Sequence, residues 1–230
     1  MVTGISTACF NPHTETEDCF KLINEAGAEV CEAALRTFYE YRPEFAKKCD
    51  TAGLDVRFIS SFPPNFEAQL FSRSRRVRGD GFYWLDQILR SAQLFGAKNY
   101  IFRGSVLDED INFITGRLNE ISNFCLRFGV NLCIENSVSG LYRRPDGFAR
   151  LKAGCPQLSG ALSLNSARLS GYPWQMYAAN MSGALSVIKI SEPEALKHIL
   201  PALKNYAFDG CIIIENTPNL KMLKKISENA

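Results

Sequence analysis

The feature that most constrains the fold is a regular alternation of short apolar segments with longer segments of helical spacing. The predicted strands fall at 2–8, 29–35, 54–61, 98–103, 129–136, 158–164, 185–190 and 211–215. They begin about 25 to 45 residues apart, which leaves room for a right-handed crossover between parallel strands. Eight such units predict an α/β protein with a (β/α)8 TIM barrel, as one domain over residues 1–230.

A doubly wound open sheet is the alternative fold. Such a sheet usually has fewer strands, and a nucleotide-binding version carries a glycine-rich turn after the first strand. The residues at 7–12, Thr-Ala-Cys-Phe-Asn-Pro, contain no glycine. The barrel is therefore the preferred prediction.

Composition limits the class of partner. The formal net charge of +2 gives no reason to expect nucleic acid, and no apolar run approaches the roughly 20 residues that span a bilayer. The eight cysteines form no CxxC pair, and Cys31, Cys133 and Cys211 lie inside apolar runs. Reduced thiols and the absence of a signal-peptide pattern near Met1 predict a cytoplasmic protein. The oligomeric state, a homo-oligomer included, is left open.

Two predicted strands end in the same way. The fifth closes with Ile134-Glu135-Asn136, and the eighth closes with Ile214-Glu215-Asn216. In a barrel the carboxyl ends of all strands meet at one mouth, so these carboxylates are expected to face each other. Lys189 interrupts the apolar seventh strand and is expected between them. The other polar side chains predicted at strand ends are Glu32, Ser61, Arg103 and Asn165.

These segments resemble the xylose isomerase-like TIM-barrel superfamily, which includes sugar-phosphate isomerases and epimerases and the endonuclease IV branch of DNA repair. The resemblance covers nearly the whole chain. The segments that carry it are Gly4-Ile5-Ser6, Val30-Cys31-Glu32, Cys133-Ile134-Glu135-Asn136, 164–171, Lys189-Ile190-Ser191-Glu192 and Ile214-Glu215.

The resemblance implies a divalent metal site whose usual ligands are only partly present. Glu135 and Glu215 match two carboxylate ligands, but Asn165 stands for the usual Asp and Lys189 for the usual His. Two further histidines are replaced by Ser61 and Arg168. A protonated lysine cannot ligate a metal, so Lys189, with Arg168, is expected to supply the positive charge instead. The cofactor prediction is therefore either none or a weakly held Mn, Mg or Zn on Glu135, Asn165 and Glu215.

The resemblance implies an isomerase or epimerase of sugar metabolism that acts on a sugar or sugar phosphate. Glu135 and Glu215 would move a proton next to a carbonyl group, and Lys189 would stabilise the enediolate oxygen. The substrate contacts are expected from Glu32, Ser61, Arg103, Asn165 and Arg168.

Two other functions remain open. One is a catalytically degenerate barrel that binds a sugar or an anionic metabolite without turnover. The other is an endonuclease IV-like phosphodiesterase, which is ranked last because that chemistry needs metals held by many histidines. His13 and His198 are the two histidines of the chain, and neither falls at a predicted strand end. The basic run from Arg73 to Arg78 is interpreted as a solvated loop, with a lid over an anionic substrate as the alternative.

Overall fold

The computed structural model describes residues 1–64, 66–104, 110–192, 195–206 and 208–216. Its strands follow one another in sequence order, each parallel to the next, and β1 pairs with β8 to close a barrel. This confirms the predicted (β/α)8 fold class. The strands are β1 (Val2–Ser6), β2 (Val30–Leu35), β3 (Asp55–Ser61), β4 (Asn99–Phe102), β5 (Asn131–Glu135), β6 (Ser159–Ser163), β7 (Leu185–Ile190) and β8 (Cys211–Ile214).

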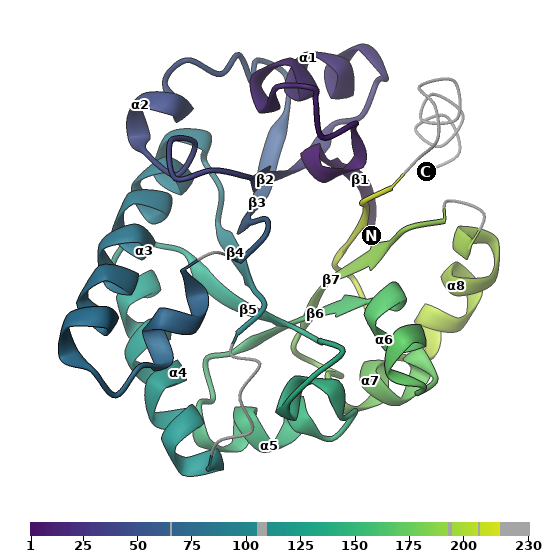
Figure 1. Cartoon of the computed structure of the whole chain (residues 1–230). Coiled ribbons are helices and arrows are strands. Elements are labelled where there is room, and N and C mark those ends of the chain that lie inside the picture. Colours follow the sequence, from purple (N-terminus) through teal and green to yellow (C-terminus); the bar gives the residue numbers. More distant parts are fainter. Residues whose placement is uncertain (65, 105–109, 193–194, 207, 217–230) are drawn as a thin grey trace.

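The helices surround this barrel as an outer ring (Figure 1). They are α1 (Thr16–Glu25), α2 (Pro43–Ala46), α3 (Arg75–Phe95), α4 (Ile111–Leu126), α5 (Gly147–Gly154), α6 (Leu164–Ser170), α7 (Trp174–Asn180) and α8 (Leu196–Leu203). Short 3-10 turns, including η2 (Glu67–Phe71), lie in the connections. No helix among the described residues combines the length and the apolar character needed to cross a membrane.

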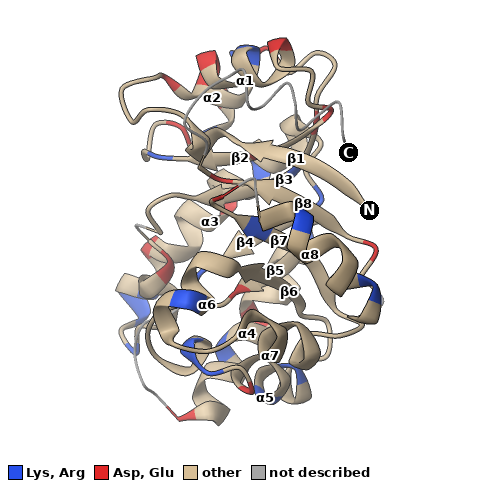
Figure 2. Cartoon of the chain, turned by 90° about the vertical axis from the view of Figure 1, so that its right-hand side faces the viewer, with Lys and Arg blue, Asp and Glu red and all other residues tan. Residues whose placement is uncertain are grey.

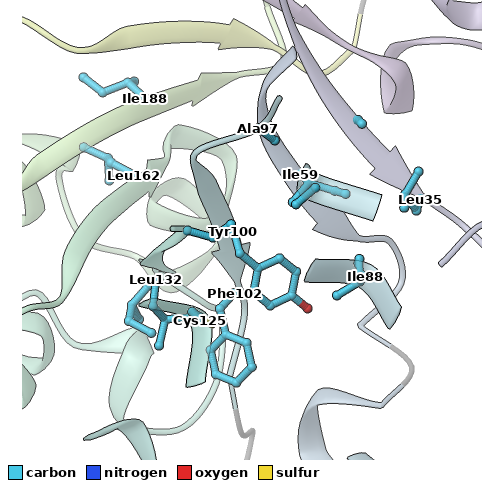
Figure 3. Packing of buried hydrophobic residues seen from close by; sticks show 14 of the residues in the cluster. Leu35, Ile59, Ile88, Ala97, Tyr100, Phe102, Cys125, Leu132, Leu162 and Ile188 are labelled. Atoms are coloured by element: carbon cyan, nitrogen blue, oxygen red, sulfur yellow. The ribbon is translucent and has the colours of Figure 1, made fainter. Parts of the chain in front are cut away.

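Each strand is buried on both faces because its side chains alternate between two apolar clusters. One cluster fills the barrel interior with Val30, Phe58, Ile101, Cys133, Ala161, Val187, Cys211 and Ile213. The other lies between the strands and the helices, where Tyr100 and Phe102 of β4 project toward the region of Ile88 and Cys125 (Figure 3). Burial on both faces explains why the strands read as nearly continuous apolar runs.

Charged positions concentrate on the helices and loops, while the strand ribbons are mostly uncharged (Figure 2). A few charged residues interrupt the strands, among them Glu32, Glu135 and Lys189, and all three are almost completely buried. Buried charges are costly unless they pair with one another or contact a ligand. These residues are therefore candidates for a functional site.

Several predicted boundaries differ from the structure. Helix α3 begins at Arg75, so most of the basic run lies in its first turns and the loop interpretation is wrong. Gly79 and Gly81 weaken the helical signal there, but Gly81 packs so closely on Leu70 that a Cβ would lie 3.1 Å from its nitrogen. The sequence also predicts helices at 43–52, 193–206 and 219–227, and none at 164–170, where α6 lies. Helix α2 ends already at Ala46, α8 and the 3-10 turn after it end at Tyr206, and 219–227 lies outside the described residues.

Candidate active site

The centre of the site is the ammonium group of Lys189, which projects from β7 into the carboxyl-terminal end of the barrel. Three carboxylates bond its Nζ: Glu32 Oε1 at 3.1 Å, Glu135 Oε2 at 3.2 Å and Glu215 Oε2 at 3.0 Å. They come from β2, from the last residue of β5 and from the residue after β8. The backbone N–H of Glu215 donates to Ile190 O at 2.9 Å, so pairing with β7 continues as far as this carboxylate.

A second cation completes the cluster from the far side of Glu135. Arg103 Nε donates to Glu135 Oε1 at 3.2 Å, so each oxygen of this carboxylate faces one positive group. The guanidinium also lies over the ring of Phe62, 4.6 Å from its centroid. Ser60 Oγ donates to Glu32 Oε1 at 2.7 Å. We refer to Glu32, Glu135, Glu215, Lys189 and Arg103 as the ion cluster.

The ion cluster contains three carboxylates and two cations, and most of it is shielded from solvent. The exposed fraction of the side chain is 1% for Lys189, 5% for Glu135 and 15% for Glu215. Burial lowers the pKa of Lys189, but Glu135, Glu215 and Glu32 outweigh it and hold that pKa well above its usual value. Burial raises the pKa of Glu135, but Arg103 and Lys189 outweigh it and the pKa falls below its usual value. Both groups are therefore charged at neutral pH.

A cavity of about 370 Å³ opens above the cluster and is lined by Glu135, Glu215, Arg103 and Phe62. Lys189 and Glu32 are not among its lining residues, so they form the layer beneath its floor. The remaining wall is rich in neutral polar side chains, chiefly Ser137, Ser163, Asn165, Ser166, Ser191 and Asn216. Side chains of this kind donate and accept hydrogen bonds at close spacing, which suits a ligand with several hydroxyl groups.

The residues at this mouth do not fit a divalent metal. The carboxylates that would act as ligands surround the Lys189 ammonium at 3.0–3.2 Å, and a protonated amine both repels a cation and offers no lone pair. Among the described residues, no group of three or more His, Cys, Asp and Glu side chains is arranged to hold a metal ion.

Four residues predicted at the mouth lie elsewhere than expected. Glu32 is the third residue of β2 rather than its end, so it lies deeper in the barrel. Ser61 is buried and donates to Glu67 Oε1 at 3.0 Å, and it does not line the cavity. Asn165 lies in α6 rather than on β6, although it does line the cavity. Arg168 is exposed and donates to Asn165 Oδ1 at 2.9 Å.

The sequence had indicated Arg168 as the second cation of the cluster, but the structure has Arg103 in that place. Arg168 lies in the last turn of α6, a helix that begins directly where β6 ends. Its guanidinium bonds an amide of its own helix, three residues back. Arg103 directly follows β4, and its neighbour strand β5 carries Glu135, which explains their contact.

Sequence reasoning missed the buried carboxylate of Glu67 in η2, which bonds the backbone of Arg103. Four donors bond it: Ser61 Oγ at 3.0 Å and Tyr100 OH at 2.7 Å on Oε1, and the backbone N–H groups of Arg103 at 2.8 Å and Gly104 at 3.1 Å on Oε2. Burial raises the pKa of Glu67 to about 7, and hydrogen bonds and the Arg103 charge offset this only in part. The sequence signal is a lone carboxylate in the stretch 66–71, Phe-Glu-Ala-Gln-Leu-Phe.

Comparisons with known proteins identify the fold. No protein-family model matches the chain, and no curated protein matches its sequence. Among solved structures, a D-tagatose 3-epimerase-like protein superposes with a TM-score of 0.78 at 14% identity, covering 100% of this chain and 96% of that one. The 3-keto-D-glucoside 4-epimerase from E. coli gives 0.75 at 11% identity, covering 100% and 98%.

A xylose isomerase domain containing protein from Salmonella typhimurium gives a TM-score of 0.69 at 15% identity, covering 98% of this chain and 93% of that one. These likenesses extend over whole chains at very low identity. They show that this chain shares the (β/α)8 TIM-barrel fold of these proteins, which confirms the resemblance at the level of the fold. Function does not follow from a shared barrel alone, because unrelated chemistries use it.

Proposed function

We propose that this chain is a sugar isomerase or epimerase that moves a proton on a carbon next to a carbonyl group. The observation that carries the proposal is the convergence of Glu135 and Glu215. Both bond the Lys189 ammonium, and both line one cavity. The solved structures that resemble the chain include proteins named as sugar epimerases, which supports the same class of substrate.

The proposed reaction needs one carboxylate to take a proton and another to return one. Glu135, whose pKa lies below its usual value, enters as the ionised base. It removes the proton from the carbon next to the carbonyl, and the electron pair of that bond forms an enediolate. Glu215, after it has taken up a proton from water, delivers that proton to the opposite face of the carbon, which gives an epimer, or to the neighbouring carbon, which gives an isomer. Exchange with solvent restores both groups.

Lys189 and Arg103 have different tasks in this proposal. Lys189 lies below the cavity floor, so its charge keeps the two carboxylates together without touching the sugar. The high pKa of Lys189 also argues against a Schiff base, which requires a neutral amine. Arg103 does line the cavity, and its guanidinium is the donor best placed for the enediolate oxygen.

The cavity favours a neutral sugar over a sugar phosphate. Among the described lining residues the charged groups are Arg103, Glu135 and Glu215, and Arg103 is already paired with Glu135. A phosphate would meet excess negative charge there, with no unpaired cation on the described wall. The serine and asparagine side chains, in contrast, match the hydroxyl groups of a sugar. Phe62, 39% exposed, offers a ring face for the apolar side of the sugar.

One observation favours the alternative of binding without turnover. Both oxygens of Glu135 are already bonded, one to Lys189 and one to Arg103. A carboxylate stabilised by two cations is a weak base. A barrel with this site could bind a sugar and leave its carbon–hydrogen bonds intact.

The experiment that separates these functions is solvent deuterium incorporation. Purified protein is incubated in D2O with a panel of free ketoses, aldoses and their phosphates, and NMR follows the signal of the carbon next to the carbonyl. An enzyme of the proposed class incorporates deuterium into a free sugar. Substrate-induced shifts in the protein spectrum without incorporation would establish binding alone.

Matched variants then test the roles of the residues. Glu135→Gln and Glu215→Gln are each expected to lower the incorporation rate by about 10²-fold or more, the usual contribution of a positioned acid or base. Glu120→Gln, which removes an exposed partner of Arg117, is the control and should leave the rate unchanged. Wild-type turnover by Glu135→Gln would refute the acid/base proposal. Elemental analysis and thermal shifts with Mn, Mg, Zn and Co test, on the same preparations, whether the protein works without a bound metal.

A further inference from the structure

Arg103 is held from two sides, and only one of them belongs to the ion cluster. Its side chain contacts Glu135 and the ring of Phe62 at the cavity wall. Its backbone N–H donates to Glu67 Oε2 at 2.8 Å, on the outer side of the barrel. Glu67 is completely buried and lies in η2, in the connection between β3 and α3.

The chain path just after Arg103 leaves little freedom. Gly104 donates its N–H to the same Oε2 at 3.1 Å and has a φ of 73°, in the left-handed region. A Cβ on Gly104 would lie 2.5 Å from Cζ of Tyr142, so a side chain does not fit. One carboxylate oxygen thus receives two successive backbone N–H groups at the point where β4 ends and the chain turns.

The geometry points to Glu67 as a positioning residue for the proposed reaction. Through Oε2 it fixes the backbone of Arg103 and Gly104, and so it holds the Arg103 guanidinium between Phe62 and Glu135. The role in a reaction rests on the proposed function, but the positioning itself does not. Glu67 lies behind β4 and does not line the cavity, so it acts only through Arg103.

The two oxygens of Glu67 have separable partners, which makes the inference testable. Oε2 takes the two backbone N–H groups, whereas Oε1 takes the hydroxyls of Ser61 and Tyr100. Only the Oε2 contacts reach Arg103. If Glu67 merely stabilised the fold, loss of either set of contacts would affect Arg103 to a similar extent.

The test compares variants that differ in reach, charge and partner. Glu67→Gln keeps the length and an oxygen for the backbone N–H groups but has no charge. Glu67→Met removes the acceptor, and Glu67→Asp keeps the charge but draws the carboxylate back by about one carbon–carbon bond from all four donors, the two backbone N–H groups included. Tyr100→Phe removes one Oε1 donor and leaves Oε2 untouched.

The readout is exchange of the Arg103 Nε–H with water, followed by 15N NMR on the full chain and assigned by its loss in Arg103→Lys. This hydrogen bonds Glu135 and is therefore protected. Arg90 Nε, which bonds Asp86 at 2.7 Å on the exposed face of α3, is the internal reference in the same spectra. The measurement needs no substrate, so it stands whether or not turnover is found.

We expect Glu67→Met and Glu67→Asp to speed Arg103 exchange by about tenfold or more, the scale of one lost hydrogen bond. Glu67→Gln and Tyr100→Phe should stay within about threefold of wild type, with Arg90 unchanged throughout. If Glu67→Met does not fold, Glu67→Asp decides alone. Wild-type exchange in folded Glu67→Asp, or acceleration by Tyr100→Phe as large as that by Glu67→Asp, would overturn the inference. In an active protein, Glu67→Asp should also lower kcat more than it raises KM.

Discussion

Two buried carboxylates lie on opposite sides of Arg103, and their pKa values are shifted in opposite directions. Glu135 faces the Arg103 side chain and Lys189, and these two cations hold its pKa below the usual value despite burial. Glu67 accepts hydrogen bonds from the Arg103 backbone and from the hydroxyls of Ser61 and Tyr100, and burial raises its pKa to about 7. Both side chains are almost completely buried.

The difference shows what each cluster is built on. Hydrogen bonds and the more distant Arg103 charge offset the desolvation of Glu67 only in part, whereas two cations bonded to Glu135 more than offset its desolvation. The ion cluster therefore depends on charge balance. The Glu67 cluster, which is Glu67 with its donors Ser61, Tyr100, Arg103 and Gly104, depends on hydrogen bonds. A cluster held by charge should respond strongly to loss of a cation. A cluster held by hydrogen bonds should respond to pH near neutrality.

The largest effect is expected from Lys189→Met. It leaves Glu32, Glu135 and Glu215 close together without their shared cation, and removal of one partner from a buried ion pair typically costs about 3–5 kcal/mol. The loss in the free energy of unfolding, measured with urea at pH 7.5, should shrink at pH 5 as the carboxylates take up protons. Lys48→Met, which removes an exposed lysine bonded to Tyr39, is the control. An equal loss at both pH values would argue against a charge-based cluster.

The second prediction uses the same position to test whether the Lys189 ammonium takes the place of a divalent metal. In Lys189→Ala the three carboxylates surround an empty space that suits a divalent cation. At a concentration of about 100 times Kd, Mn²⁺ should stabilise this variant by about 3 kcal/mol, or roughly 5 °C or more in Tm. The wild-type protein should show no comparable shift. Equal stabilisation of both proteins would place the metal away from Lys189.

Much of the fold was predictable because every strand is apolar on both faces and lies between helical segments. Glu135, Lys189 and Glu215 were identifiable as site candidates because each interrupts or closes such a strand. Ser60 and Ser61 show the limit of prediction from the sequence. Because side chains alternate along a strand, Ser60 faces Glu32 and Ser61 faces Glu67, and the sequence does not tell which of the two serines points into the barrel. Glu67 was not predictable in this way, because its four partners come from β3, β4 and the turn after β4, which meet only in the folded chain.

The third prediction concerns the pH dependence of stability. Because the pKa of Glu67 is about 7 in the folded chain and its ordinary value is 4.5, the folded state binds this proton more tightly. The contribution to stability is thus complete below pH 4.5 and is lost as the pH rises through 7, by about 3 kcal/mol in all. Glu67→Gln should lack this decline. Urea denaturation at pH 5, 6, 7 and 8 measures it, with Glu120→Gln as the exposed control. Parallel curves for wild type and Glu67→Gln would contradict the raised pKa.

The smallest effects are expected from two adjacent serines, one in each cluster. Ser60→Ala removes the 2.7 Å bond to Glu32 Oε1, and Ser61→Ala removes the 3.0 Å bond to Glu67 Oε1. Each loss should cost about 1–2 kcal/mol at pH 8, where Glu67 is ionised. At pH 5.5 the cost of Ser61→Ala should fall, because a protonated Glu67 no longer needs every donor. The cost of Ser60→Ala should persist, because the Lys189 ammonium that bonds Glu32 stays charged. If the two costs change with pH in the same way, the contrast between a charge-held and a hydrogen-bond-held cluster fails.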